Sequence, residues 1–239
     1  MIKIETDGVF GFKQAIKGMR KPMNSLDRSD SMFQCGFNPL DDGYCDIYYD
    51  NILNEIVESI DWYEAGDDVQ VGPNDHELMM KLGKSGSSHS KYRRFIIVYA
   101  DITAPLYMLK ELDTYRMGVE KNSSSTMHKI HAKEFTLEDF GCEHLNSEEL
   151  EHLESTIKLL NANRVLFLDS KNKQDWWQMI QLLPSSYMQN REYMFSYEAL
   201  AKIYQERKEH KLDEWRCLCD WIKTLPYSEI ITLEETSEQ

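Results

Sequence analysis

The 239-residue sequence has no run of 18 apolar residues, so nothing in it predicts a membrane-spanning helix. Its first residues, MIKIETDGVF, lack the basic start, the apolar stretch and the small-residue cleavage site of a signal peptide. The five cysteines are odd in number and scattered, which favours reduced thiols over a disulfide framework. These absences together lead us to expect a cytoplasmic protein.

Positive charge is also in short supply, because 27 Lys and Arg residues stand against 41 Asp and Glu residues. The resulting net charge of −14 disfavours binding to duplex nucleic acid or to an anionic membrane, since both attract basic surfaces. Hydrophobic residues make up 41% and charged residues 28%, which is typical of a globular protein. With no internal repeat and no shift in composition, residues 1–239 are expected to form a single domain.

The charge is unevenly distributed, because residues 84–133 hold nine basic and four acidic side chains. This basic island favours either a solvated basic face or a phosphate-binding cleft. Its basic residues are Lys84, Lys91, Arg93, Arg94, Lys110, Arg116, Lys121, Lys129 and Lys133.

Familiar phosphate and metal motifs are missing. The run Gly83-Lys84-Ser85 is not a P-loop, because the first glycine of that motif would fall on Leu78. Three histidines and a cysteine between residues 128 and 144 match no zinc-ligand spacing, so we expect no metal site. The cysteines at 217 and 219 are two residues apart on a predicted helix and therefore do not face each other.

Hydrophobic periodicity and turn residues predict an α+β fold, in which a twisted, mostly antiparallel sheet packs against long helices. Strands are expected at 2–6 and 95–102, and helices at 46–63, 74–82, 104–117, 147–163, 175–183, 185–210 and 213–223. Residues 18–45 are expected to form a long loop, and residues 232–239 a frayed acidic tail.

The run NSSSTMH (122–128) places hydroxyl groups beside a histidine within the basic island. It is typical either of a polar connecting loop or of a hydrogen-bonding floor for a phosphorylated ligand, because hydroxyl groups, backbone amides and basic side chains are the usual partners of phosphate.

Two segments, read together, resemble the flavin-dependent thymidylate synthases. The first is DITAP (101–105), followed by a predicted helix, by Thr114, Tyr115 and Arg116, and by NSSST (122–126). In that family an Ala-Pro helix start precedes an Arg-His-Arg triplet, seven residues and a serine. Only the last arginine of the triplet is kept here, as Arg116, and the family serine falls on Ser124, or on Ser125 if one insertion is allowed.

The second segment runs from LLPSSY (182–187) to ERKEHKLDEW (206–215) and resembles the family's Leu-Pro and Leu-x6-Arg-x3-His pattern. Leu200 and Arg207 match without a gap, whereas His210 and Trp215 match after small changes of length. The resemblance covers roughly residues 85–225.

The resemblance implies a homotetramer that holds FAD and transfers a one-carbon unit to C5 of a pyrimidine deoxynucleotide such as dUMP. Methylenetetrahydrofolate would be the carbon donor and NADPH the reductant, as suits a phage or bacterial enzyme. Expected catalytic residues are Arg207 and either Ser124 or Ser125. Expected FAD contacts are Arg116, His210, Asn122 and Tyr115, and expected substrate contacts are Arg207, Gln189 and Arg191.

The sequence departs from the family at Thr114 and Tyr115, where the family has arginine and histidine. Ser123 stands where glutamate is usual, and Ile180 or Gln181 where an arginine precedes Leu-Pro. These departures leave two alternatives open. The first is a non-catalytic nucleotide-binding or interaction protein on the same fold, and the second is an acidic oligomeric protein without a ligand.

Overall fold

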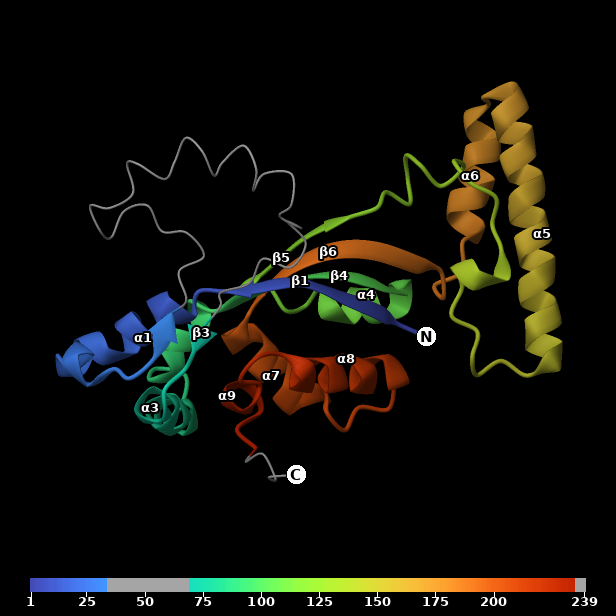
Figure 1. Cartoon of the computed structure of the whole chain (residues 1–239). Coiled ribbons are helices and arrows are strands. Elements are labelled where there is room, and N and C mark those ends of the chain that lie inside the picture. The colour runs from blue at the N-terminus through green and yellow to red at the C-terminus, as the bar shows by residue number, and fades with distance from the viewer. Residues whose placement is uncertain (34–68, 235–239) are drawn as a thin grey trace, which may run out of the picture. The chain divides into compact units, whose positions relative to one another are not determined.

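The computed structural model of the chain describes residues 1–33 and 69–234 (Figure 1). The strands are β1 (Lys3–Phe10), β2 (Met32–Phe33), β3 (Val69–Gln70), β4 (Ile97–Pro105), β5 (Val119–Ser123) and β6 (Met188–Ser196). The α-helices are α1 (Phe12–Arg20), α3 (Pro73–Lys84), α4 (Leu106–Leu112), α5 (Ser147–Ser170), α6 (Lys173–Leu182), α7 (Tyr197–Arg207), α8 (Asp213–Thr224) and α9 (Glu229–Thr232). Short 3-10 helices are η1 (Lys21–Met23), η2 (Leu26–Arg28), η4 (Ser90–Arg94) and η5 (Leu137–Asp139).

The chain forms two compact units. Unit 1 comprises residues 1–5, 100–193 and 206–221, and unit 2 comprises residues 6–99, 194–205 and 222–239. Strands β1, β4 and β6 contribute residues to both units. Among the described residues, no helix is both long and apolar enough to cross a bilayer.

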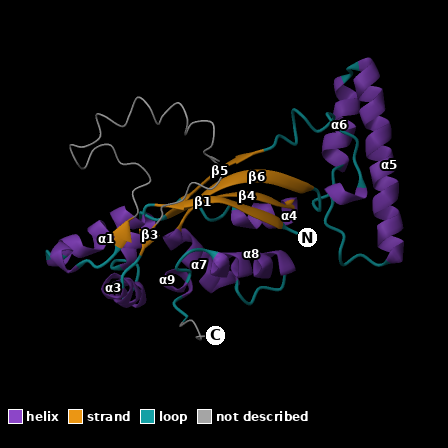
Figure 2. Cartoon of the chain, viewed as in Figure 1, coloured by secondary structure: helices purple, strands orange, loops and turns teal. Residues whose placement is uncertain are grey.

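A four-stranded antiparallel sheet with the order β1-β4-β6-β5 is the main sheet of the described chain (Figure 2). The predicted α+β fold with a mostly antiparallel sheet and long helices is therefore confirmed. In β4 the buried residues alternate with partly exposed ones, and Val98, Ala100 and Ile102 are fully buried on one face. This period of two is the pattern of a strand with one face on a core.

The strand predicted at 95–102 is observed as β4, which begins at Ile97 and ends at Pro105. The strand predicted at 2–6 is observed as β1, which continues to Phe10. The helix expected from residue 104 to 117 is shorter in the structure, because α4 ends at Leu112. Pro105 lies at its N-cap in an extended conformation. The expected loop at 18–45 begins inside a helix, because α1 continues to Arg20. The expected helix at 46–63 lies outside the described residues.

The predicted long helix at 185–210 is wrong, because β6 occupies its first half and only α7 is helical. Within β6, Gln189, Tyr193 and Phe195 are buried and spaced by even numbers of residues, as the faces of a strand require. Ser196 ends the strand, and its hydroxyl oxygen accepts a hydrogen bond from the amide of Ala199 at 3.2 Å. A serine that caps the first turn of a helix in this way marks the true helix start.

Helix α5 begins one residue after Asn146, whose side chain accepts hydrogen bonds from the amides of Glu148 and Glu149. Asparagine is a strong N-cap residue, which accounts for the helix start at Ser147 that the sequence predicted. The helix continues seven residues beyond the expected end at residue 163, until Lys171 adopts a left-handed conformation.

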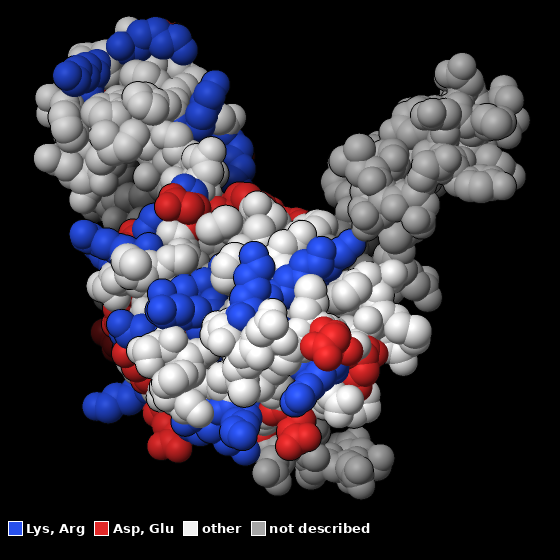
Figure 3. All heavy atoms as spheres, turned by 90° about the vertical axis from the view of Figure 1, so that its left-hand side faces the viewer, with Lys and Arg blue, Asp and Glu red and all other residues white. Residues whose placement is uncertain are grey.

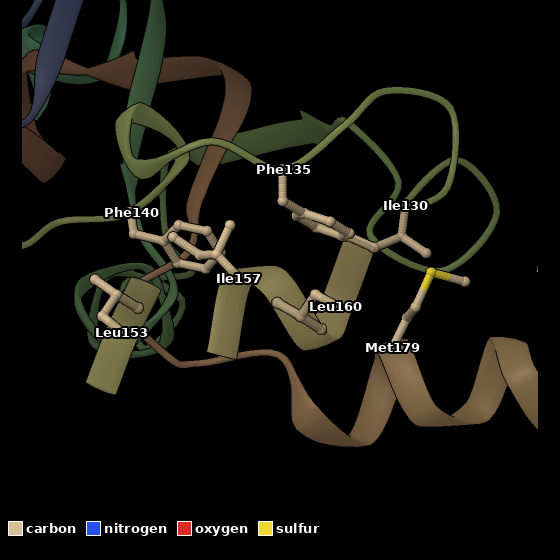
Figure 4. Close-up of a cluster of buried hydrophobic side chains, with 7 residues drawn as sticks. All are labelled: Ile130, Phe135, Phe140, Leu153, Ile157, Leu160 and Met179. Atoms are coloured by element: carbon tan, nitrogen blue, oxygen red, sulfur yellow. The ribbon is translucent and has the colours of Figure 1, made fainter. Parts of the chain in front are cut away.

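Helices α5 and α6 form a hairpin whose apolar core is shown in Figure 4. Side chains from α5 point toward a methionine of α6 and toward aromatic residues of the connecting segment before α5. This cluster positions residues 130–140 against the hairpin, and its members are Ile130, Phe135, Phe140, Leu153, Ile157, Leu160 and Met179.

In unit 2, a buried ion pair joins α1 to the start of α3. The Nε atom of Arg20 donates a hydrogen bond to Oδ1 of Asp75 at 2.5 Å, and both side chains are almost fully buried. The hydroxyl groups of Ser29 and Ser31 donate to the other carboxylate oxygen, each at 2.6 Å. Burial raises the pKa of Asp75, but the hydrogen bonds from Ser29, Ser31 and Arg20 outweigh it and hold the pKa below its ordinary value.

We predict that Asp75→Asn destabilises the protein by about 3–5 kcal/mol, because it leaves the Arg20 guanidinium buried without a counter-charge. A carboxylate with a lowered pKa stabilises the fold above its unfolded-state pKa, and this contribution is lost as the pH falls below about 4. Urea denaturation between pH 7 and pH 3 should therefore show a weaker pH dependence in the variant. Asp27→Asn, at an exposed aspartate, is the matched control; equal effects of the two changes would contradict the prediction.

Candidate functional site

Two carboxylates at the C-terminal end of α4 organise the predicted site residues of unit 1. Glu111 lies in the last turn of α4, and Asp113 is the first residue after it. Each carboxylate pairs with an arginine that was predicted from the sequence, at 3.3 Å for Glu111 with Arg207 and at 2.7 Å for Asp113 with Arg191. The fold therefore gives these acids a site role that the sequence analysis missed.

Arg207 is held on three sides. Its Nη1 atom pairs with Glu111, its Nε atom donates to the hydroxyl oxygen of Tyr115 at 3.0 Å, and its guanidinium carbon lies 4.6 Å from the centre of the Trp215 ring. Trp215 is fully buried and donates its indole N–H to Glu111 at 3.1 Å. Because the ring, the hydroxyl and the carboxylate fix the guanidinium, its direction is set before any ligand arrives.

His210 and Tyr115 belong to the same cluster. His210 Nε2 lies 3.9 Å from a Glu111 oxygen, and its Nδ1 atom accepts a hydrogen bond from the amide of Leu212 at 3.2 Å. The hydroxyl of Tyr115 donates to Glu206 at 2.7 Å. Burial, followed by this hydrogen bond, raises the pKa of Tyr115, although Arg207 opposes the rise. The structure thus brings together three predicted residues, Arg207, His210 and Tyr115.

A second series of contacts connects Asp113 to the hydroxyl-rich segment at 122–128. Arg191 donates from Nη1 to Asp113 and from Nε to the side-chain oxygen of Gln189 at 2.9 Å. The amide of Gln189, which is buried, donates to the carbonyl oxygen of Ser124 at 2.6 Å. The backbone N–H of Ser124 in turn donates to the carbonyl of Asn190 at 3.0 Å. These bonds anchor the segment that follows β5 to strand β6.

Ser125 has a hydrogen-bond pattern that suits binding. Its hydroxyl oxygen accepts from the backbone N–H groups of Met127 at 3.3 Å and of His128 at 2.9 Å. With both lone pairs engaged, the O–H proton remains available to donate to an acceptor such as a phosphate oxygen. Among the described residues, no hydrogen-bond partner of this hydroxyl can act as a general base, so its geometry favours a ligand donor over a nucleophile.

Ser124 and Ser125 line a cavity of about 670 Å³ in unit 1. Hydroxyl groups, lysines and two aromatic rings share its wall, and strand β6 supplies Asn190. The lining residues are Lys3, Thr103, Ser124, Ser125, Thr126, Lys129, Ile130, Lys133, Phe135, Thr136, Glu138, Asp139, Tyr187, Met188 and Asn190. A volume of this size is typical of small-molecule sites.

The lysines of this cavity differ in how far their charge is neutralised. Lys133 pairs with Asp139 at 2.5 Å, and that hydrogen bond raises the pKa of Lys133. Burial raises the pKa of Asp139, but the hydrogen bonds from Lys133 and Thr136 outweigh burial and lower it. Within the described ranges, Lys3 and Lys129 form no ion pair, so two exposed cations remain at the rim.

Two of the predicted FAD contacts stand apart from these clusters. Arg116 is exposed and forms no hydrogen bond or ion pair within residues 1–33 and 69–234. Asn122 lies in β5 and accepts a hydrogen bond from the next amide, that of Ser123, at 3.0 Å. Among the described residues, no group of three or more histidine, cysteine or acidic side chains is arranged to hold a metal ion.

Lys129 and Lys133 of the cavity wall belong to the basic island, but the sequence did not distinguish them from its other basic residues. Nothing in the sequence singled out Glu111 or Glu206, because their partners lie more than 90 positions away in the chain.

Known structures share this arrangement of sheet and helices. Thymidylate synthase X from Helicobacter pylori, solved with FAD and dUMP, matches with a TM-score of 0.61 and 16% identity, over 98% of each chain. The UMP/dUMP methylase PolB from Streptomyces cacaoi, solved with 5-Br UMP, matches with a TM-score of 0.56 and 11% identity, over 98% of this chain and 94% of that one. No protein-family profile and no curated protein sequence matches the chain.

The chain therefore has an α+β fold of the kind found in pyrimidine nucleotide methylases. More narrowly, it has the fold of the flavin-dependent thymidylate synthases, as the sequence resemblance implied. The structural likeness extends over nearly the whole chain, well beyond the segment at about 85–225 that carries the sequence resemblance.

Proposed function

We propose that the protein is a flavin-dependent enzyme that transfers a one-carbon unit to C5 of a pyrimidine nucleotide such as dUMP. The observation that carries this proposal is the unit 1 cavity, where the Ser124–Ser125 segment meets two lysines without an ion-pair partner and two aromatic side chains. The fold, shared with enzymes solved with dUMP and with 5-Br UMP, supports the same substrate class.

The charge of the cavity suits a nucleoside monophosphate. A phosphate monoester carries about −1.5 to −2 at pH 7. Lys3 and Lys129 offer two positive charges, and Glu138 places one carboxylate on the same wall. The donating hydroxyl of Ser125 adds a directional hydrogen bond to a phosphate oxygen. Tyr187, which is partly exposed, contributes ring surface to the same cavity, and ring surface is where a base would stack.

Arg207 is the residue proposed to bind and polarise the pyrimidine ring. A planar guanidinium presents two parallel donors to a carbonyl, and it stabilises negative charge that develops on the ring oxygen. Glu111 accepts from the same guanidinium in the structure. A pyrimidine carbonyl would therefore have to share Arg207 with Glu111 or displace it.

The residues proposed to hold FAD fit an anionic cofactor. Arg116 offers an exposed cation, Asn122 an exposed amide, and His210 a partly exposed imidazole edge. Tyr115 acts indirectly, because its hydroxyl positions Arg207. When bound, the flavin would supply the redox chemistry, and these side chains would bind and orient it. Methylenetetrahydrofolate and NADPH are the proposed carbon donor and reductant.

The pair of Glu111 with Arg207 favours one alternative, a non-catalytic nucleotide-binding or interaction protein on the same fold. If the carboxylate keeps the guanidinium, the cavity can still bind a nucleotide through its phosphate, but the ring is not activated. Turnover distinguishes this alternative from the enzyme.

The proposed homotetramer has a candidate surface on the α5–α6 hairpin. Apolar side chains on this hairpin are exposed to solvent, which is unfavourable in a monomer, and such patches mark protein interfaces. Their exposed fractions are 52% for Leu159, 60% for Val165, 55% for Leu166, 37% for Leu168, 37% for Trp177 and 38% for Leu182.

We predict that Lys129→Glu lowers the affinity for dUMP and UMP by about tenfold or more, because it replaces an attraction to phosphate with a repulsion. The affinity for deoxyuridine, which lacks the phosphate, should stay unchanged. Isothermal titration calorimetry of both ligands measures the difference. Lys158→Glu, an exposed lysine of α5, is the matched control; equal losses for dUMP and deoxyuridine would remove the phosphate assignment.

We predict that the purified protein retains a flavin absorbance band after addition of FAD and desalting, and that Arg116→Ala weakens this band. With dUMP, methylenetetrahydrofolate and NADPH, the wild type should form a C5-methylated product, and Arg207→Ala should lower kcat/KM about 100-fold or more. Mass spectrometry of the nucleotide measures the product. Binding of dUMP without flavin retention or turnover would replace the enzyme by the non-catalytic alternative.

We predict that Val165→Glu combined with Leu166→Glu reduces the molar mass of the assembly, because two charges would be buried without partners at the interface. Size-exclusion chromatography with light scattering measures the mass, and circular dichroism checks that the helices are kept. Leu26→Glu, at an exposed leucine of unit 2, should leave the mass unchanged. A monomeric wild type would be incompatible with the tetramer.

A further inference from the structure

Unit 2 contains a groove that none of the predicted site residues enters. It has a volume of about 660 Å³ and lies between α1, η1, the end of α3 and the segment at 88–95. The lining residues are Gln14, Lys17, Gly18, Met19, Lys21, Pro22, Met23, Leu82, Ser88, His89, Lys91, Tyr92 and Phe95. The groove is therefore large enough for a nucleotide-sized ligand.

The rim of the groove is basic in an acidic protein. Helix α1 (FKQAIKGMR) and η4 (SKYRR) contain no acidic residue, and no carboxylate occurs among the described residues that line the groove. Lys17, Lys21 and Lys91 are exposed and form no ion pair within the described part of the chain. Figure 3 shows Lys and Arg side chains gathered in a band across this face.

The floor of the groove is apolar and aromatic. Phe95 is 52% exposed and lies between η4 and β4. A Cβ atom at Gly18 would lie 3.4 Å from the Phe95 ring, so the glycine allows the ring to lie close against α1. The adjacent Tyr92 and Met19 are buried and fix the ring's surroundings. Such a ring beside unpaired lysines is a stacking surface for the base of an anionic ligand.

We propose that this groove is a second nucleotide site, specific for the nucleoside polyphosphate class. The base stacks on Phe95, and the phosphates are bound by Lys17, Lys21 and Lys91. Three lysines in a wall without a carboxylate suit the three to four negative charges of a triphosphate, whereas the wall of the unit 1 cavity includes Glu138 and Asp139 beside its lysines. The site lies in a different unit from the residues proposed for catalysis, so it goes beyond the proposed function.

Calorimetric titration of the full chain with ATP, dTTP, dTMP and inorganic tripolyphosphate tests the proposal. Triphosphates should bind about tenfold or more tightly than dTMP, and the affinity should fall as salt is raised. Lys17→Glu combined with Lys91→Glu should lower triphosphate affinity about 100-fold. Phe95→Ala should weaken ATP and dTTP but leave tripolyphosphate unchanged, and Lys158→Glu is the charge-matched control.

Cross-titration separates this site from the first one. Lys129→Glu should leave triphosphate binding intact, and the Lys17/Lys91 double variant should leave dUMP binding and any bound flavin intact. Loss of triphosphate binding in Lys129→Glu, or loss of flavin in the double variant, would overturn the proposal. Titration with a short oligothymidylate identifies the source of the ligand. If the oligonucleotide binds and loses affinity in the Lys17/Lys91 double variant and in Phe95→Ala, the ligand is a single strand, and the assignment to a free nucleoside polyphosphate is overturned.

Discussion

The arrangement of unit 1 depends on the neutralisation of two arginines by two carboxylates at the end of one short helix. Glu111 and Asp113 are separated by one residue, so they point to different partners, and each meets an arginine at 2.7–3.3 Å. A partly buried guanidinium without an acceptor would cost several kcal/mol. The two pairs therefore fix β6 and residues 206–215 against α4, and with them the predicted ligand contacts.

The pair at Asp113 determines the geometry of the cavity. Because Arg191 is held by the carboxylate, it can orient Gln189, and Gln189 can hold the carbonyl of Ser124 at 2.6 Å. The serine segment is thus positioned by a relay of neutral and charged hydrogen bonds that starts from an acid outside the cavity. The pair at Glu111 has the opposite consequence, since it occupies the guanidinium that a pyrimidine would need. One helix end therefore both anchors the segment proposed to bind a ligand and restrains the arginine proposed to activate a bound ring.

Sequence patterns predicted the parts of the fold that rest on local chemistry. The helices at 175–183 and 213–223 agree closely with α6 and α8, because helix-favouring residues and a following proline or turn define them within a few positions. The prediction of one helix over residues 185–210 was wrong because the apolar residues there fit both a period of two and a period near four. Only pairing within the sheet selects the strand. Likewise, Arg207, His210 and Tyr115 were found by motif, whereas Glu111 was not, because its partner lies 96 residues away in sequence and no local pattern marks the pair.

The distribution of unpaired charge connects the two cavities to their proposed ligands. Lys133 pairs with Asp139. Lys3 and Lys129 around one cavity, and Lys17, Lys21 and Lys91 around the other, form no ion pair within the described residues. Clustered like charges repel one another and lower stability, so such clusters persist where an anion compensates them. The absence of carboxylates among the described residues that line the groove in unit 2, together with its apolar floor, is the physical basis for assigning a monophosphate to the first cavity and a polyphosphate to the second.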